Sequence, residues 1–219
     1  MKFLLTSAGF TNKSISNALL ELAGKPFSEL NLAFIPTAAN VEPGNKDWLI
    51  DDLITCKNLG FKSIDIVDIS AVSQDIWLPR LEAADVFLFG GGNTFHLMHW
   101  MGKSGLKNFL PELLKTKIYV GISAGSMVVC KSLDLSNSKK LYYEDGTNDY
   151  DKDAGLGFVD ILIRPHLNSP YFPEVNLENM EKMSKEIPAT FYALDDNSAI
   201  KVVDGGVSVV SEGEWKKFN

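Results

Sequence analysis

A serine in a glycine-rich turn is the residue of this sequence best suited to covalent chemistry. The segment Gly121-Ile122-Ser123-Ala124-Gly125 follows the apolar run Ile118–Val120 and precedes the apolar run Met127–Cys130. This order predicts a strand, a sharp turn and a helix. The small neighbours permit a strained backbone and close approach of a substrate. Ser123 is therefore a candidate nucleophile; alternatively, it caps the helix of an ordinary strand-to-helix turn.

A serine nucleophile needs a general base, and histidine titrates near neutrality. The sequence contains three histidines. His96 and His99 lie three positions apart in the predicted helix Thr94–Met101; the spacing suits two metal ligands, but no third ligand suggests itself, and we interpret both as partly buried helix residues. His166 lies in a loop directly after the predicted strand Phe158–Arg164, where sites form. It is the candidate base, with a solvated loop histidine as the alternative.

A base histidine is usually oriented by a carboxylate. Asp195 and Asp196 follow the predicted strand Thr190–Leu194, in the loop to the next strand. We expect only one of them to act. The alternative is a turn, because Asp-Asp-Asn-Ser is favourable turn chemistry.

Acyl transfer also needs N–H donors for a developing oxyanion. The segment Gly90-Gly91-Gly92-Asn93-Thr94 lets amides turn inward, and Thr94 opens a helix whose N-terminus favours negative charge. The amide of Ala124 is a second candidate donor. A phosphate cradle is the competing interpretation, but the chain lacks G-x-x-x-x-G-K-[ST], and the triplet does not fit G-x-G-x-x-G.

Strands and helices alternate over the first 130 residues, and these elements must position the candidate residues. This alternation predicts an α/β fold, with a mostly parallel sheet and helices on both faces. Ligands in such sheets bind beyond the carboxyl ends of the strands. The predicted strands are Lys2–Thr6, Asn31–Pro36, Ser63–Asp68, Val86–Phe89 and Ile118–Val120, and the predicted helices are Ser14–Ala23, Trp48–Leu59, Pro79–Ala84, Thr94–Met101 and Leu106–Leu114.

The pattern changes after residue 130. Leu133–Tyr143 and Phe158–Arg164 are predicted strands, separated by the polar segment Glu144–Asp153, which is typical of a mobile loop. Whether this loop closes over the site is left open. The helix Pro173–Glu186 and three strands follow, and we expect residues 1–219 to form one domain. The three strands are Thr190–Leu194, Ala199–Val203 and Val207–Val210.

Composition excludes several classes of protein. The chain has 219 residues, 45% of them hydrophobic, and a net charge of −7 without a block of Lys or Arg, which argues against nucleic acid as a partner. No apolar run approaches the roughly 20 residues that span a bilayer, and Met1–Phe10 fits a first strand better than a signal peptide. Cys56 and Cys130 are far apart, and Cys130 is expected to be a buried free thiol, so a reducing cytoplasm fits.

Three ordered motifs together resemble peptidase family S51, the serine peptidases that include aspartyl dipeptidase (dipeptidase E) and cyanophycinase. They are Phe87-Leu88-Phe89-Gly90-Gly91-Gly92-Asn93-Thr94-Phe95, Gly121-Ile122-Ser123-Ala124-Gly125-Ser126 and Ile163-Arg164-Pro165-His166. The resemblance covers nearly the whole chain. It implies a flavodoxin-like fold similar to that of class I glutamine amidotransferases, with extra C-terminal strands.

The resemblance also implies roles for individual residues. Ser123 would be the nucleophile and His166 the base, and the oxyanion would bind the amides of Gly92 and Ala124, with Gly91 as a neighbouring candidate. Aspartyl dipeptidases have a glutamate as third member; its position matches Asp196 here, with Asp195 as the alternative. Asn93, Arg164 and Asn168 are candidate substrate-binding residues.

Specificity for acidic residues is expected to be weak or absent. Recognition of a carboxylate favours a bidentate arginine, the sequence has only Arg80 and Arg164, and Leu167–Met183 contains none. We therefore interpret the chain as a cytoplasmic serine peptidase of short peptides that needs no metal or cofactor, and a homodimer is one assembly open to it. The alternatives are a non-peptide amide hydrolase or amidotransferase-like enzyme of the same fold, and a non-catalytic binding or regulatory protein that retains the turn.

Overall fold

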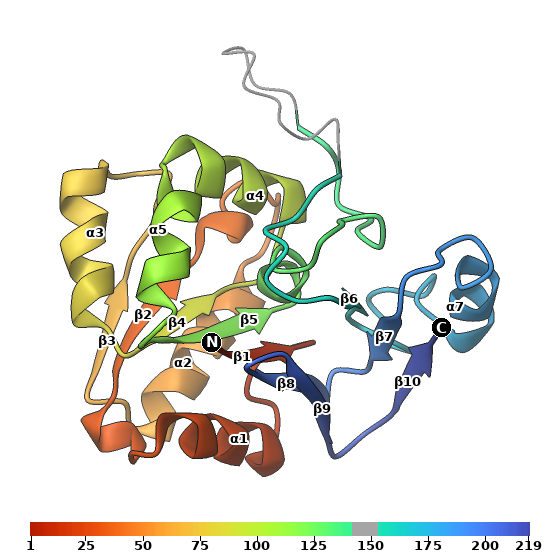
Figure 1. Ribbon diagram of the computed structural model, residues 1–219, viewed down its shortest axis with the longest axis horizontal. Coiled ribbons are helices and arrows are strands. Elements are labelled where there is room, and N and C mark those ends of the chain that lie inside the picture. Colours follow the sequence, from red (N-terminus) through yellow and green to blue (C-terminus); the bar gives the residue numbers. More distant parts are fainter. Residues whose placement is uncertain (142–152) are drawn as a thin grey trace.

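A seven-stranded sheet forms the centre of the computed structural model, which describes residues 1–141 and 153–219 (Figure 1). The strand order is β3-β2-β4-β5-β1-β8-β9. Strands β1 to β5 pair in parallel, whereas β8 and β9 continue the sheet beyond β1 in antiparallel orientation. The predicted mostly parallel α/β fold is thus confirmed. The strands are β1 Lys2–Thr6, β2 Asn31–Ile35, β3 Ser63–Ile66, β4 Val86–Phe89, β5 Ile118–Ile122, β8 Ser198–Val203 and β9 Gly206–Ser211.

Successive strand residues point to opposite faces of the sheet, and both faces are covered by helices. In β4, Phe87 and Phe89 belong to one buried cluster, and Val86 and Leu88 belong to the other. Helices α3, α4 and α5 cover the first face, and α1 and α2 cover the second (Figure 1). These helices are α1 Lys13–Ala23, α2 Asp47–Leu59, α3 Gln74–Ala83, α4 Thr94–Lys103 and α5 Leu106–Leu113, and two short 3-10 helices are η1 Phe27–Glu29 and η2 Thr37–Ala39.

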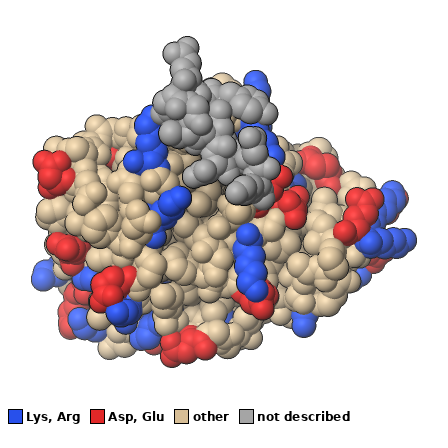
Figure 2. All heavy atoms as spheres, turned by 45° about the horizontal axis from the view of Figure 1, so that its top comes forward, with Lys and Arg blue, Asp and Glu red and all other residues tan. Residues whose placement is uncertain are grey.

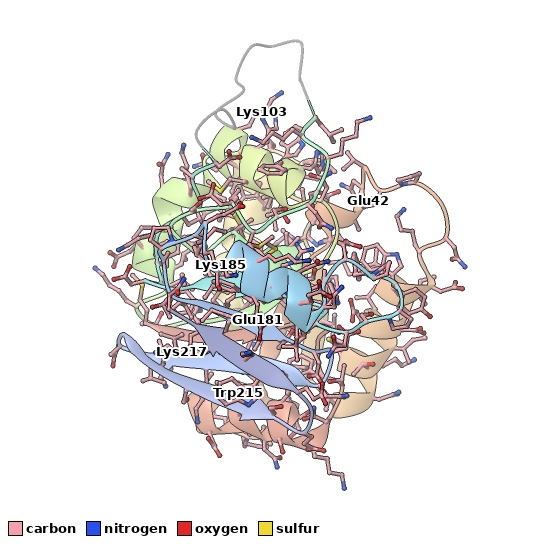
Figure 3. All side chains as sticks on the ribbon, turned by 90° about the vertical axis from the view of Figure 1, so that its right-hand side faces the viewer. Glu42, Lys103, Glu181, Lys185, Trp215 and Lys217 are labelled. Atoms are coloured by element: carbon pink, nitrogen blue, oxygen red, sulfur yellow. The ribbon has the colours of Figure 1, made fainter. Side chains whose placement is uncertain are left out.

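A second, three-stranded sheet lies beside the large one, in the order β10-β7-β6 (Figure 1). It consists of β6 Leu162–Arg164, β7 Phe191–Leu194 and β10 Trp215–Phe218. Helix α7, Leu177–Met183, lies next to it (Figure 3). Glu181 of this helix pairs with Lys216 of β10 at 2.6 Å. The loops after β6 and β7 lead to the neighbourhood of β5, where the candidate nucleophile lies.

The predicted strand Leu133–Tyr143 is wrong over its described part, because residues 133–141 form no strand. Two serine hydroxyls accept backbone N–H groups of this segment: Ser132 from Asp134 at 3.1 Å and Ser136 from Ser138 at 3.3 Å. Such local bonds compete with strand pairing. The predicted loop 144–153 lies outside the described residues except for Asp153, which pairs with Lys140 at 2.6 Å.

Several predicted boundaries are also wrong. The helix expected at Pro79–Ala84 begins at Gln74, so Pro79 lies in its interior and not in its first turn. The helix expected at Pro173–Glu186 begins only at Leu177, because the side chain of Asn176 accepts the N–H of Asn179 and caps it. The strand expected at Phe158–Arg164 shortens to β6, the helix after Ser123 is the short α6 Ala124–Met127, and β10 was not predicted.

Two further features of the described residues are the state of the two cysteines and the length and hydropathy of the helices. Cys56 and Cys130 are both buried and free. Within residues 1–141 and 153–219, no helix has the length and hydropathy to cross a bilayer.

Candidate active site

Ser123 lies at the junction of β5 and α6, in a sterically strained conformation. Its φ of 48° and ψ of −104° are rare for a residue with a side chain. The turn is fixed on both sides: the N–H of Ser123 donates to the carbonyl of Thr6 at 3.1 Å, and the N–H of Ser126 donates to the carbonyl of Ser123 at 2.9 Å. The turn therefore holds the serine at the carboxyl end of the sheet.

The two glycines of the motif are required by close packing. A Cβ on Gly125 would lie 2.0 Å from the carbonyl oxygen of Phe89, and one on Gly121 would lie 2.5 Å from the nitrogen of Ser126. Neither position has room for a side chain. Gly125 is thus required by the packing of the turn against β4, and Gly121 by its close approach to the turn that follows Ser123.

His166 lies directly against Ser123. Its Nε2 is 2.9 Å from Oγ of Ser123, and its ring stacks on Phe172 with centroids 4.3 Å apart. The backbone of His166 has a φ of 68°, and the next residue is anchored by a bond from the N–H of Leu167 to the carbonyl of Leu194 at 2.9 Å. The loop after β6 is thereby fixed to the end of β7, and the imidazole is held over the serine.

The two adjacent aspartates have different partners. Oδ1 of Asp196 is 2.7 Å from Nδ1 of His166. Asp195 instead accepts the N–H of Asn197 at 3.0 Å and the N–H of Glu214 at 2.6 Å, so it closes the turn between β7 and β8. The sequence left open which of the two aspartates contacts His166. In the structure, Asp196 and not Asp195 contacts the imidazole.

Ser7 connects two of these groups and was missed by the sequence reasoning. It lies in the loop after β1, is fully buried, and its Oγ donates to Oδ1 of Asp196 at 3.1 Å. The same Oγ accepts the backbone N–H of His166 at 2.8 Å. Nothing in the local sequence marks Ser7, because its partners lie 159 and 189 positions away.

The surroundings of Asp196 favour its ionised form. Burial raises the pKa of this carboxyl, but the hydrogen bond from His166, the charge of that imidazole and the hydrogen bond from Ser7 together hold it below the ordinary value. Asp196 is therefore a carboxylate at neutral pH. A carboxylate in this place fixes the imidazole tautomer that presents an unprotonated Nε2 to the serine.

Two of the three predicted oxyanion donors lie beside the serine. Ala124 follows it directly in the chain, and a Cβ on Gly91 would be 3.6 Å from Cβ of Ser123. Gly92 has a φ of 125°, and a Cβ there would lie 2.3 Å from the carbonyl oxygen of Ala38. In the part of the chain that is described, no protein acceptor takes up the N–H of Gly91, Gly92 or Ala124. These amides therefore have hydrogen-bonding capacity for a substrate.

The three candidate substrate-binding side chains bind other protein groups. Asn93 accepts the N–H of His96 at 2.9 Å and so caps α4, and Asn168 donates to Glu214 at 3.1 Å. Arg164 is buried and donates to the carbonyl of Leu135 at 2.6 Å. Substrate binding by these residues stays a prediction.

His96 and His99 are buried in α4. Burial, followed by the charge of His99, lowers the pKa of His96 to about 4, so it is neutral at pH 7. Within the described ranges, no group of three or more His, Cys, Asp or Glu side chains is placed to hold a metal ion.

Charge on the visible surface is mixed. Figure 2 shows Lys and Arg interspersed with Asp and Glu on the face it presents, with broad uncharged areas between them.

The candidate site has a hydroxyl, an imidazole and a carboxylate in one hydrogen-bonded series, with backbone amides beside the hydroxyl. This set of groups is suited to nucleophilic attack on a carbonyl.

Comparisons with known proteins agree with this chemistry. The sequence model of peptidase family S51 matches residues 3–210. The peptidase E of Nostoc sp. is 26% identical over 185 residues, which cover 82% of this chain and 72% of that protein. An uncharacterised peptidase of Listeria innocua is 28% identical over 185 residues, covering 79% and 80%. The crystal structure of a putative peptidase E from Listeria monocytogenes superposes with a TM-score of 0.78 at 23% identity, covering 97% of this chain and 98% of that one.

Proposed function

Because the chain belongs to peptidase family S51, we propose that it is a serine peptidase that hydrolyses short peptides through an acyl-enzyme. The observation that carries the proposal is the hydrogen-bonded series from Ser123 through His166 to Asp196, with distances of 2.9 Å and 2.7 Å. Membership of the family alone would leave open which residues react. The series supports Ser123, His166 and Asp196 as the reacting residues.

In this mechanism Oγ of Ser123 attacks the scissile carbonyl and Nε2 of His166 takes its proton. Asp196 stabilises the imidazolium that forms, and it stays ionised. The amides of Gly92 and Ala124, with Gly91 beside them, bind the oxyanion. His166 then donates the proton to the leaving amine, and a water molecule that His166 activates hydrolyses the acyl-enzyme.

Ser7 is a positioning residue in this mechanism. Its hydroxyl joins the backbone of His166 to the carboxylate of Asp196. It thereby fixes two members of the series relative to β1. A catalytic geometry needs such support, because side chains held only by their own rotamers lose alignment.

Hydrolysis of matched substrates tests the proposal. Wild-type protein and Ser123→Ala are given di- and tripeptides, and in parallel glutamine and asparagine as non-peptide amides. We expect release of amino acids from peptides by wild type only. Hydrolysis of the amides alone would favour an amidohydrolase of the same fold, and equal inactivity of both proteins on every substrate would favour a non-catalytic binding protein.

A further inference from the structure

Neither arginine of the sequence is placed to receive an acidic substrate side chain. Arg80 makes a hydrogen-bonded ion pair with Asp65, through Nε at 2.8 Å and through Nη2, and its Nη2 also donates to the carbonyl of Ile66. Arg164 is buried and bonded to the carbonyl of Leu135. The side chains of α2 that lie beside the candidate site are instead an indole and a carboxyl group.

Trp48, in the first turn of α2, lies next to the candidate oxyanion loop. A Cβ built on Gly91 would be 3.8 Å from Cζ3 of Trp48, and the same point is 3.6 Å from Cβ of Ser123. Trp48 is 39% exposed. One edge of its ring therefore lies near the serine, and part of the residue is accessible to a ligand.

Asp52 lies one turn further along α2. Residues at positions i and i+4 share one face of a helix, so Asp52 and Trp48 point in the same direction. A Cβ on Gly9 would be 3.1 Å from Oδ1 of Asp52 and 3.2 Å from Cδ1 of Ile122, the residue that precedes Ser123. The carboxyl thus lies between α2 and the loop after β1 that also carries Ser7.

The Asp52 carboxyl has no compensating partner in the described part of the chain, where no hydrogen bond or ion pair to it is formed. Burial, followed by the charge of Asp51, raises its pKa to about 7. Keeping an unpaired carboxylate partly buried costs free energy, and a bound cation would offset that cost. The surroundings of Asp52 therefore favour a positively charged ligand.

We propose that Trp48 and Asp52 form a subsite for an ammonium group of the peptide substrate. This inference rests on the proposed peptidase function. The carboxylate pairs with the ammonium, and the indole face adds a cation–π contact. Two sources supply such a group: the free N-terminus of the peptide, or a lysine side chain near the scissile bond. An aspartate side chain in the same place would be repelled by Asp52.

Binding to the inactive Ser123→Ala protein tests the subsite without turnover. Isothermal calorimetry compares Leu-Leu, N-acetyl-Lys-Leu and N-acetyl-Leu-Leu, which carry an α-ammonium, a side-chain ammonium and neither. We expect at least one ammonium peptide to bind tenfold or more tightly than N-acetyl-Leu-Leu. We further expect Asp52→Asn, added to Ser123→Ala, to remove that advantage. The peptide that shows the advantage identifies the source of the ammonium.

Asp51→Asn is the matched control, because it removes the same charge from the adjacent, exposed position of α2. It should leave every dissociation constant within twofold. Equal binding of the three peptides, no binding of any of them, or an advantage that survives Asp52→Asn would overturn the subsite. Hydrolysis by the wild type separates the two ideas: an ammonium advantage without hydrolysis keeps the subsite and removes the peptidase function, whereas hydrolysis without an advantage does the reverse.

Discussion

Nδ1 of His166 lies 2.7 Å from Oδ1 of Asp196, although the two residues come from loops that follow different strands of the small sheet. The parallel pairing of β6 and β7 brings these loops to the same edge. On the far side of the imidazole, Nε2 reaches Ser123 of the large sheet. The candidate site is therefore a junction between the two sheets.

Asp196→Asn should lower kcat/KM for peptide hydrolysis by about 10²- to 10⁴-fold, because an amide neither fixes the required tautomer nor stabilises the imidazolium. Steady-state kinetics with a common dipeptide measures this. Asp195→Asn is the comparison: it weakens the turn at Glu214 and should cost about 1–3 kcal/mol of stability, while kcat/KM stays within about threefold. A larger kinetic loss in Asp195→Asn than in Asp196→Asn would reverse the assignment.

Ser7→Ala should lower kcat about tenfold with little change in KM, because it removes a support of His166 and Asp196 without touching the substrate. It should also raise the pKa of the Asp196 carboxyl, which loses a hydrogen bond that lowers this pKa, and an NMR titration of the carboxyl measures the shift. Ser7→Thr, which keeps the hydroxyl, should recover most of the activity. A uniform loss of folded protein with an unchanged titration of Asp196 would mean that Ser7 has only a structural role.

Gly125→Ala should destabilise the fold by about 3 kcal/mol or more, because its Cβ would overlap the carbonyl oxygen of Phe89 at 2.0 Å. Gly102→Ala provides the control: the nearest atom to its Cβ is the flexible Nζ of Lys107 at 3.6 Å, and alanine is the better helix former by about 1 kcal/mol. Urea denaturation of the two variants should therefore move the midpoint in opposite directions. Equal midpoints would contradict the close packing at Gly125.

Asp52 should make stability fall as the pH rises. Its pKa is about 7 in the folded state against an ordinary 3.8, so the folded protein holds the extra proton between these values. The stabilisation is complete below pH 3.8 and is lost as the pH rises to 7. Because the carboxyl is partly exposed, we expect a loss on the order of 2 kcal/mol. Asp52→Asn should abolish this component, so that its melting temperature relative to wild type increases between pH 4 and pH 8. A constant difference would show that the Asp52 carboxyl is not perturbed.

The parts of the site that lie in local motifs could be predicted from the sequence. Ser123 and the glycines around it belong to one strand–turn–helix unit, and His166 directly follows a strand. The large sheet could also be predicted, because hydrophobic runs and helical periods alternate along the first 130 residues of the sequence.

The remaining parts depend on long-range packing. Ser7 contacts residues 159 and 189 positions away, and Trp48 approaches the site only because α2 packs on the sheet. Adjacent residues such as Asp195 and Asp196 point in different directions, and only the placement of β7 decides which of them meets His166. The segment 133–141 was predicted to be a strand, but serine hydroxyls take up two of its backbone N–H groups.

Labelling with a fluorophosphonate is the most direct test of the central claim, that His166 and Asp196 activate Ser123 as a nucleophile. Intact mass and peptide mapping locate the adduct, and the labelling rate is compared among wild type, Ser123→Ala and His166→Ala. We predict one adduct per chain, on Ser123, absent from Ser123→Ala and formed at least a hundredfold more slowly in His166→Ala. A wild-type protein that is not labelled, or one labelled at another residue, would contradict the account.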